Sequence, residues 1–141
     1  MKLYQKIQMR QWTRILSTDT IVCLDGKIYG KPKDRKDAYN TLATFSGMTH
    51  EVVSGVSIIS KKLNMTMYVK SYVTFKKLTK EMIDDYLKTD EPYDKAGSYA
   101  IQGEGRSLIE GYSGSLDNII GLPIEYIKDM LRVMLNEVEN R

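Results

Sequence analysis

Two runs rich in β-forming residues, 51–60 and 65–75, lie only four residues apart in this chain of 141 residues. Strands joined by so short a connection pair most simply as antiparallel neighbours. The run from Ile15 to Leu24 is also β-branched and apolar, and the turn signal Asp25-Gly26 allows Lys27–Tyr29 to return as a second strand. Strand pairs of this kind predict a sheet on which the remaining elements must pack.

Three other segments have helical patterns. Asp34 is a suitable N-cap for a helix over residues 35–46, which Gly47 would end. A second helix is predicted over Lys80–Lys88, ahead of Pro92. Apolar residues near the C-terminus recur at steps of three and four, the pattern of an amphipathic helix packed on a core: Ile127, Met130, Leu131, Met134, Leu135 and Val138. The sequence therefore predicts an α/β (mixed α+β) fold, with helices against a mixed, largely antiparallel sheet.

Two further segments carry weaker local signals. Gly97–Ile101 is interpreted as a short strand that leads into the loop 102–105. Residues 1–18 contain four basic residues and no acidic one, with apolar residues at roughly helical spacing. A basic amphipathic helix on the domain surface is the favoured interpretation of that segment, and an organellar transit peptide is the alternative.

Size and composition restrict the class of protein. A hydrophobic content of 42% in 141 residues is enough for one core, so residues 1–141 are predicted to form a single domain. The net charge of +3 is spread along the chain, which gives no argument for a nucleic-acid or membrane partner. Cys23 is the only cysteine, so a disulfide framework is excluded. With no apolar stretch of membrane-spanning length, we expect a cytoplasmic protein.

Most strong local motifs are missing. The chain has no Walker loop, no pairs of metal-binding cysteines and no glycine fingerprint for dinucleotides. His50 is the only histidine, and no Gly-x-Ser-x-Gly elbow accompanies it, so serine-hydrolase chemistry is disfavoured. A lone histidine at the start of a strand is more often a hydrogen-bonded packing residue, and we assign His50 no catalytic role.

Polar residues at strand ends and in glycine-bearing turns remain as candidates. Asp19 and Thr20 interrupt an apolar strand, where a carboxylate needs hydrogen bonds, a metal or a cleft. Lys31 lies between a glycine and a proline, which suits a point-charge contact to phosphate. Lys95 precedes the predicted strand, and Gln102 lies in a loop that can approach a ligand closely. Each signal is weak alone, since structural interpretations are commoner for every one.

Taken together and in order, these pieces are far more specific. Along the chain stand, in this order, Asp19-Thr20-Ile21-Val22, Asp25-Gly26-Lys27-Ile28, Gly30-Lys31-Pro32, Ser46-Gly47-Met48-Thr49-His50, Val73-Thr74-Phe75, Tyr86-Leu87, Glu91-Pro92, Asp94 through Gly103, and Asn118 through Pro123. In this ordered series, from about Ile15 to the C-terminal helix, the chain resembles the Maf family of nucleotide pyrophosphatases.

This resemblance implies a fold like that of the inosine triphosphate pyrophosphatases, with nucleotide in a cleft between two lobes. It implies a hydrolase that cuts the α–β phosphoanhydride bond of a nucleoside triphosphate with a divalent metal, Mg or Mn. Asp19 inherits the role of proton acceptor, Lys31 that of a phosphate-site residue, and Lys95 is carried over as further positive charge. Thr20 and Gln102 inherit substrate specificity, and the glutamine is typical of the branch that acts on dTTP and UTP.

The resemblance also raises expectations about the front of the chain. Family members begin with a strand and loop bearing Ser-x-Ser-Pro-Arg-Arg and then a helix, and nothing before Asp19 matches these convincingly. We therefore expect a Maf-like domain that lacks this segment. A catalytically impaired remnant that binds nucleotide or a protein partner is the alternative to an active enzyme. An unrelated binding module is the third possibility, and a homodimer is common in such families.

Overall fold

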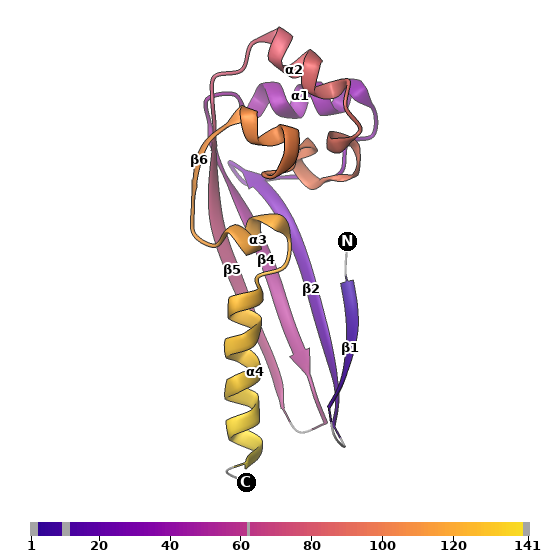
Figure 1. Cartoon of the computed structure of the whole chain (residues 1–141), viewed down its shortest axis with the longest axis vertical. Coiled ribbons are helices and arrows are strands. Elements are labelled where there is room, and N and C mark those ends of the chain that lie inside the picture. Colours follow the sequence, from indigo (N-terminus) through magenta and orange to yellow (C-terminus); the bar gives the residue numbers. More distant parts are fainter. Residues whose placement is uncertain (1–2, 10–11, 62, 140–141) are drawn as a thin grey trace.

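The computed structural model describes residues 3–9, 12–61 and 63–139 of the chain, and the side chains of residues 15–61 and 63–137 (Figure 1). The strands are β1 (Leu3–Met9), β2 (Trp12–Leu24), β3 (Lys27–Tyr29), β4 (Thr49–Ile59), β5 (Asn64–Phe75) and β6 (Ile109–Ser113). The helices are α1 (Arg35–Phe45), α2 (Lys80–Leu87), α3 (Leu116–Ile120) and α4 (Ile124–Glu139), and short 3-10 segments are η1 (Glu91–Asp94), η2 (Ala96–Ser98) and η3 (Gly103–Leu108).

The described strands form one six-stranded sheet in the order β1-β2-β4-β5-β6, with β3 paired to the end of β2. Every one of these pairings is antiparallel. The turn between β2 and β3 places Asp25 and Gly26 at φ angles of 50° and 79°, as a two-residue hairpin turn requires. The predicted mixed α/β fold, with its first hairpin and the pair of β-rich runs, is confirmed.

Both predicted internal helices are present, with ends within a residue of the expected ones. The Asp34 carboxylate accepts a hydrogen bond of 2.8 Å from the Asp37 backbone N–H and caps α1. The chain leaves α1 through Gly47, whose φ of 68° lies in the left-handed region that glycine tolerates best. The Thr79 hydroxyl caps α2 in the same way, by accepting from the Met82 N–H.

Two hydrophobic clusters share the sheet. The first lies between the sheet and the pair α1 and α2, and its centre includes Leu42, Phe45 and Phe75. The second lies under α4, which runs along the other half of the sheet in Figure 1. Its buried members are Leu16, Val56, Ile58, Ile127, Met130 and Met134. The predicted amphipathic C-terminal helix is confirmed, and none of the described helices is long and apolar enough to cross a membrane.

One predicted strand is wrong. Residues 97–101 form no strand, because Gly97 and Ser98 have φ angles of 76° and 63° and so cannot follow an extended path. The backbone of this segment is instead tied to other elements. The Gly97 N–H donates to the Gly30 carbonyl, and the Ala100 N–H donates to the Tyr86 hydroxyl.

The helix predicted over residues 1–18 is also wrong. Residues 3–9 form β1 and pair with β2 from Leu3 opposite Thr18 to Met9 opposite Trp12. The edge of β2 offers hydrogen bonds to a second strand, and this pairing outweighs the rough helical spacing of the apolar residues. Lys2 and Arg10, which the helical interpretation also used, lie outside the described residues. No local signal predicted β6 or α3.

Candidate active site

A cavity of about 1110 Å³ lies beside the middle of β2. Strand β1 pairs with β2 as far as Thr18, and β3 pairs with it from Val22 onward, so the stretch between these pairings faces the cavity. The rest of the wall comes from the end of β3 and the turn after it, from Val52 of β4, from the segment of η1 to Gly103, and from residues 119–122. This volume lies just above the range of about 300–1,000 Å³ that is usual for small-molecule sites.

All five site residues predicted from the sequence line this one cavity: Asp19, Thr20, Lys31, Lys95 and Gln102. They come from three separate stretches of the chain, which the sheet and the turns around it bring together. Two adjacent strand residues, Asp19 and Thr20, point to opposite faces of a sheet, and the cavity reaches both. The grouping is a structural finding, whereas the chemical role of each residue stays a prediction.

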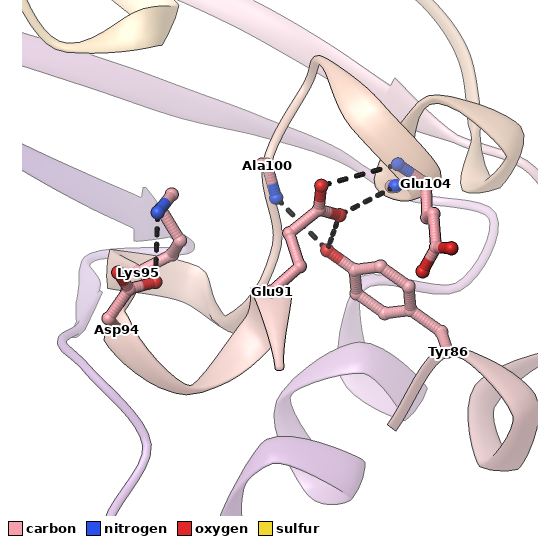
Figure 2. Close-up of polar contacts among 7 residues, drawn as sticks. Tyr86, Glu91, Asp94, Lys95, Ala100 and Glu104 are labelled. Atoms are coloured by element: carbon pink, nitrogen blue, oxygen red, sulfur yellow. Dashed lines mark hydrogen bonds and ion pairs between the residues drawn. The ribbon is translucent and has the colours of Figure 1, made fainter. Parts of the chain in front are cut away.

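Two lysines, Lys31 and Lys95, lie near the carboxylate of Asp94 on the cavity wall. Lys95 Nζ lies 2.8 Å from Asp94 Oδ1, as Figure 2 shows. The hydrogen bond and charge of Lys95, and more weakly the charge of Lys31, lower the pKa of the Asp94 carboxyl. Lys31 and Lys95 thus both lie near Asp94 on the cavity wall, and an anionic ligand there would meet their two positive charges together with the negative charge of Asp94.

Thr20 joins the sheet to the turn after α3. Its hydroxyl lies 2.7 Å from the Ser54 hydroxyl on the neighbouring strand and donates to the Gly121 carbonyl at 3.3 Å. The Ser54 hydroxyl then donates to the Thr20 oxygen, since Thr20 has a single proton to give. This chain of bonds fixes the side chain of Thr20 on the cavity wall and draws Gly121 toward β2.

The loop that carries Gln102 is held by a partly buried network of hydrogen bonds around the carboxylate of Glu91. Glu91 accepts hydrogen bonds from the Tyr86 hydroxyl at 2.6 Å, the Gly105 N–H at 2.8 Å and the Glu104 N–H at 3.2 Å (Figure 2). The Tyr86 hydroxyl in turn accepts from the Ala100 N–H at 3.2 Å. Burial and the hydrogen bond to Glu91 raise the pKa of the Tyr86 phenol well above its usual value, so it stays protonated as a donor.

Behind the cavity wall lies His50, which is only 1% exposed. Its Nε2 lies 2.6 Å from the hydroxyl of Tyr99, a residue that lines the cavity, and its ring stacks on Phe45 with centroids 4.4 Å apart. Burial lowers the pKa of His50 to about 4, so the imidazole is neutral at pH 7. The interpretation of His50 as a hydrogen-bonded packing residue is confirmed.

Sequence reasoning missed the partnership of Tyr86 and Glu91. Both residues belong to the matching blocks, but neither was assigned a role. The glycines at 103 and 105 were the available signal, because paired glycines in one loop indicate a close approach by another group. At Gly103 that group is the Glu91 carboxylate, and at Gly105 it is the Ala100 carbonyl oxygen, followed by the Tyr86 hydroxyl.

The chain matches the family model described as Maf-like protein over residues 2–134. The chain belongs to the Maf family. It is 48% identical over 110 residues to a dTTP/UTP pyrophosphatase of Bacillus cytotoxicus, which covers 78% of this chain and 58% of that relative. It is 45% identical over 117 residues to the protein of that name from Thermosipho africanus, with coverage of 83% and 61%.

A third Maf relative, a dTTP/UTP pyrophosphatase of Clostridium botulinum, is 43% identical over 128 residues, with 89% of this chain and 68% of that relative covered. The chain thus spans about three fifths of the length of the first two relatives. The resemblance to this family inferred from the ordered blocks is confirmed.

Proposed function

We propose that this Maf protein is a nucleoside triphosphate pyrophosphatase that hydrolyses dTTP and UTP to the monophosphate and pyrophosphate. One observation carries the proposal: a base candidate, two cations and two polar specificity candidates from separate stretches of chain line a single cavity. The names of the relatives support the choice of substrate.

Hydrolysis at the α–β bridge requires a nucleophilic water, a group that takes its proton and positive charge around the phosphates. The water oxygen bonds to the α-phosphorus, the bond from that phosphorus to the bridging oxygen breaks, and pyrophosphate leaves with the electron pair. Asp19 takes the proton of the water as a general base. Lys31 and Lys95 bind the phosphate oxygens as point charges.

A divalent cation, Mg or Mn, belongs to this proposal. The described residues contain no group of three or more histidine, cysteine, aspartate or glutamate side chains that would hold a metal unaided. Mg²⁺ commonly takes one or two carboxylates and completes its shell with substrate phosphates and water, so such a cation would bind together with the nucleotide. The bound cation would be held chiefly by the substrate phosphates and water, and it would neutralise charge on the phosphates.

Selectivity for the base rests on Gln102 and Thr20 in this proposal. An amide both donates and accepts hydrogen bonds, as the edge of thymine or uracil does, whereas a carboxylate only accepts. Gln102 is exposed in the cavity wall and therefore open to a ligand. The fixed hydroxyl of Thr20 supplies a second polar atom on the cavity wall.

The test is a panel of dTTP, UTP, CTP, ATP and 7-methyl-GTP with Mg²⁺ or Mn²⁺, assayed for released pyrophosphate. We expect dTTP and UTP to be hydrolysed much faster than ATP or 7-methyl-GTP, and EDTA to stop the release. Equal rates across the panel would contradict the proposed selectivity. Calorimetric binding of dTTP without release of pyrophosphate from any nucleotide would identify the catalytically impaired remnant instead.

A further inference from the structure

We propose that Glu91 and Tyr86 are positioning residues for base selectivity: together they fix the loop that presents Gln102 to the nucleotide. The inference rests on the proposed function, since it concerns how the same cavity tells one base from another. Neither side chain needs to touch the base for this effect.

Both oxygens of the Glu91 carboxylate are used to shape this loop. Oε1 accepts from the backbone N–H of Glu104, and Oε2 accepts from that of Gly105. Two successive N–H groups bound to one carboxylate fix the direction of the chain just after Gln102. Charge-assisted hydrogen bonds of this kind are about twice as strong as neutral ones.

Tyr86 fixes the same loop on the other side of Gln102. Its hydroxyl accepts from the Ala100 N–H and donates to Glu91, so one pair of side chains holds the loop at residues 100, 104 and 105. Figure 2 shows the Tyr86 hydroxyl and the Glu91 carboxylate between Ala100 and Glu104, with hydrogen bonds to both ends of this loop. Gln102 lies between the held positions, and its backbone has little freedom left.

The glycines of the loop fit this interpretation. A Cβ at Gly103 would overlap Glu91 Oε1, and the φ of 76° there disfavours other residues independently. A Cβ at Gly105 would overlap the Ala100 carbonyl oxygen and come within 2.9 Å of the Tyr86 hydroxyl. The backbone at Gly103 and Gly105 therefore lies so close to its neighbours, Glu91 and Tyr86 among them, that neither position has room for a Cβ atom.

The pair is itself anchored in rigid parts of the molecule. Tyr86 lies on α2 and is buried in the first hydrophobic cluster. Glu91 begins η1, and the next residue, Pro92, is fully buried. Selectivity by a single amide depends on its placement, since a displacement of about 1 Å in a site can cost on the order of 10²-fold in rate. A loop fixed to the core supplies that placement.

The decisive variant is Glu91→Gln, which keeps the shape of the side chain but replaces one acceptor oxygen with an NH₂ group. That group would face a backbone N–H donor, so the loop must move. Tyr86→Phe is the milder second variant, because it removes only the hydroxyl that joins Ala100 to Glu91. Asp85→Asn is the matched control: it removes a charge next to Tyr86, from an exposed ion pair with Lys88 outside the cavity.

The experiment compares dTTP with dCTP, which carry the same sugar and differ only in the base, through the ratio of their kcat/KM values and of their dissociation constants. We expect Glu91→Gln to lower the preference for dTTP by roughly 10-fold or more, Tyr86→Phe to lower it less, and Asp85→Asn to leave it unchanged. Thermal midpoints show whether each variant is folded. If Glu91→Gln does not fold, the preference of Tyr86→Phe for dTTP decides whether the inference holds.

A preference for dTTP that is unchanged in the folded variants, or that falls equally in Asp85→Asn, would overturn the inference and leave the proposed function intact. A parent protein that releases no pyrophosphate would overturn the proposed function. The ratio of dissociation constants would then still decide the role of Glu91 and Tyr86. A loss of thermal stability with no change in either ratio would mean that the pair only stabilises the fold.

Discussion

Among single residues, Asp19 carries the sharpest prediction about chemistry. Asp19→Asn preserves the shape of the side chain, but an amide does not take a proton from water. We expect kcat for dTTP to fall by roughly 10²–10⁴-fold, while the dissociation constant of dTTP changes much less. Steady-state kinetics and calorimetry would measure the two effects separately. An unchanged kcat would remove Asp19 from the role of general base.

His50 provides a residue-scale prediction about stability and pH. Its pKa is about 4 in the folded protein and about 6.5 in an unfolded chain, so the unfolded state binds more protons between these values. The stability that the neutral imidazole contributes is therefore fully present above about pH 6.5 and is lost as the pH falls toward 4. At pH 5 the loss should be roughly 2 kcal/mol.

Urea unfolding of the parent protein and of His50→Gln at pH 7 and pH 5 would isolate this effect. Carboxyl groups titrate in both proteins and cancel in the comparison. The difference in free energy of unfolding between the parent protein and His50→Gln should decrease by roughly 2 kcal/mol between pH 7 and pH 5. A gap that is constant with pH would show that His50 is as easily protonated in the folded state as in the unfolded one.

At the scale of elements, the start of α1 connects stability with the site. Lys31 lies in the turn between β3 and α1, and the Asp34 cap sets where that turn ends. Asp34→Ala leaves the Asp37 N–H without its acceptor, so we expect a loss of about 1 kcal/mol in the free energy of unfolding. Denaturant unfolding measures this loss.

Asp84→Ala is the control for Asp34→Ala. Asp84 lies on α2 and forms an exposed ion pair with Arg35, the first residue of α1. Exposed pairs of this type contribute less than a cap, typically 0–1 kcal/mol. If Asp34→Ala and Asp84→Ala lower the free energy of unfolding equally, the cap contributes no more to stability than the exposed ion pair does. Because the cap ends the turn that holds Lys31, Asp34→Ala should also raise KM for dTTP, whereas Asp84→Ala should not.

On the scale of the whole molecule, the two hydrophobic clusters have different roles: the first contributes to the cavity wall, and the second contributes to stability away from most of it. Members of the first cluster, including Val22, Val52 and Tyr99, line part of the cavity, whereas α4 and the buried members of the second cluster lie along the other half of the sheet. Strands β4 and β5 run through both clusters. Damage to the second cluster should therefore lower stability without changing the shape of the site.

Met134→Ala tests this division, since Met134 lies on the sheet-facing side of α4 and is almost fully buried. The substitution should cost roughly 2–5 kcal/mol and lower the thermal midpoint, with the preference for dTTP unchanged below the transition. Met48→Ala, the same substitution at an exposed position, should have little effect on either quantity. A changed nucleotide preference in folded Met134→Ala would show that the two clusters are coupled.

The sequence alone determined the elements whose causes are local. The Asp25-Gly26 turn, the Asp34 cap and the helical spacing at the C-terminus act between residues a few positions apart, and the structure agrees with each. The ordered blocks also identified the family and the candidates Asp19 and Lys31. None of this required knowledge of which segments meet.

Only the tertiary structure decided the rest. The path of residues 97–101 follows from bonds to Gly30 and Tyr86, and β1 exists because β2 has an edge to pair with. The hydrogen bonds from the backbone N–H groups of Glu104 and Gly105 to Glu91 join residues that are 13 and 14 positions apart in the chain. They depend on how η1 packs beside η3. Such choices depend on partners distant in the chain, and a distant partner can override a local preference because its hydrogen bonds and burial exist only once the chain is folded.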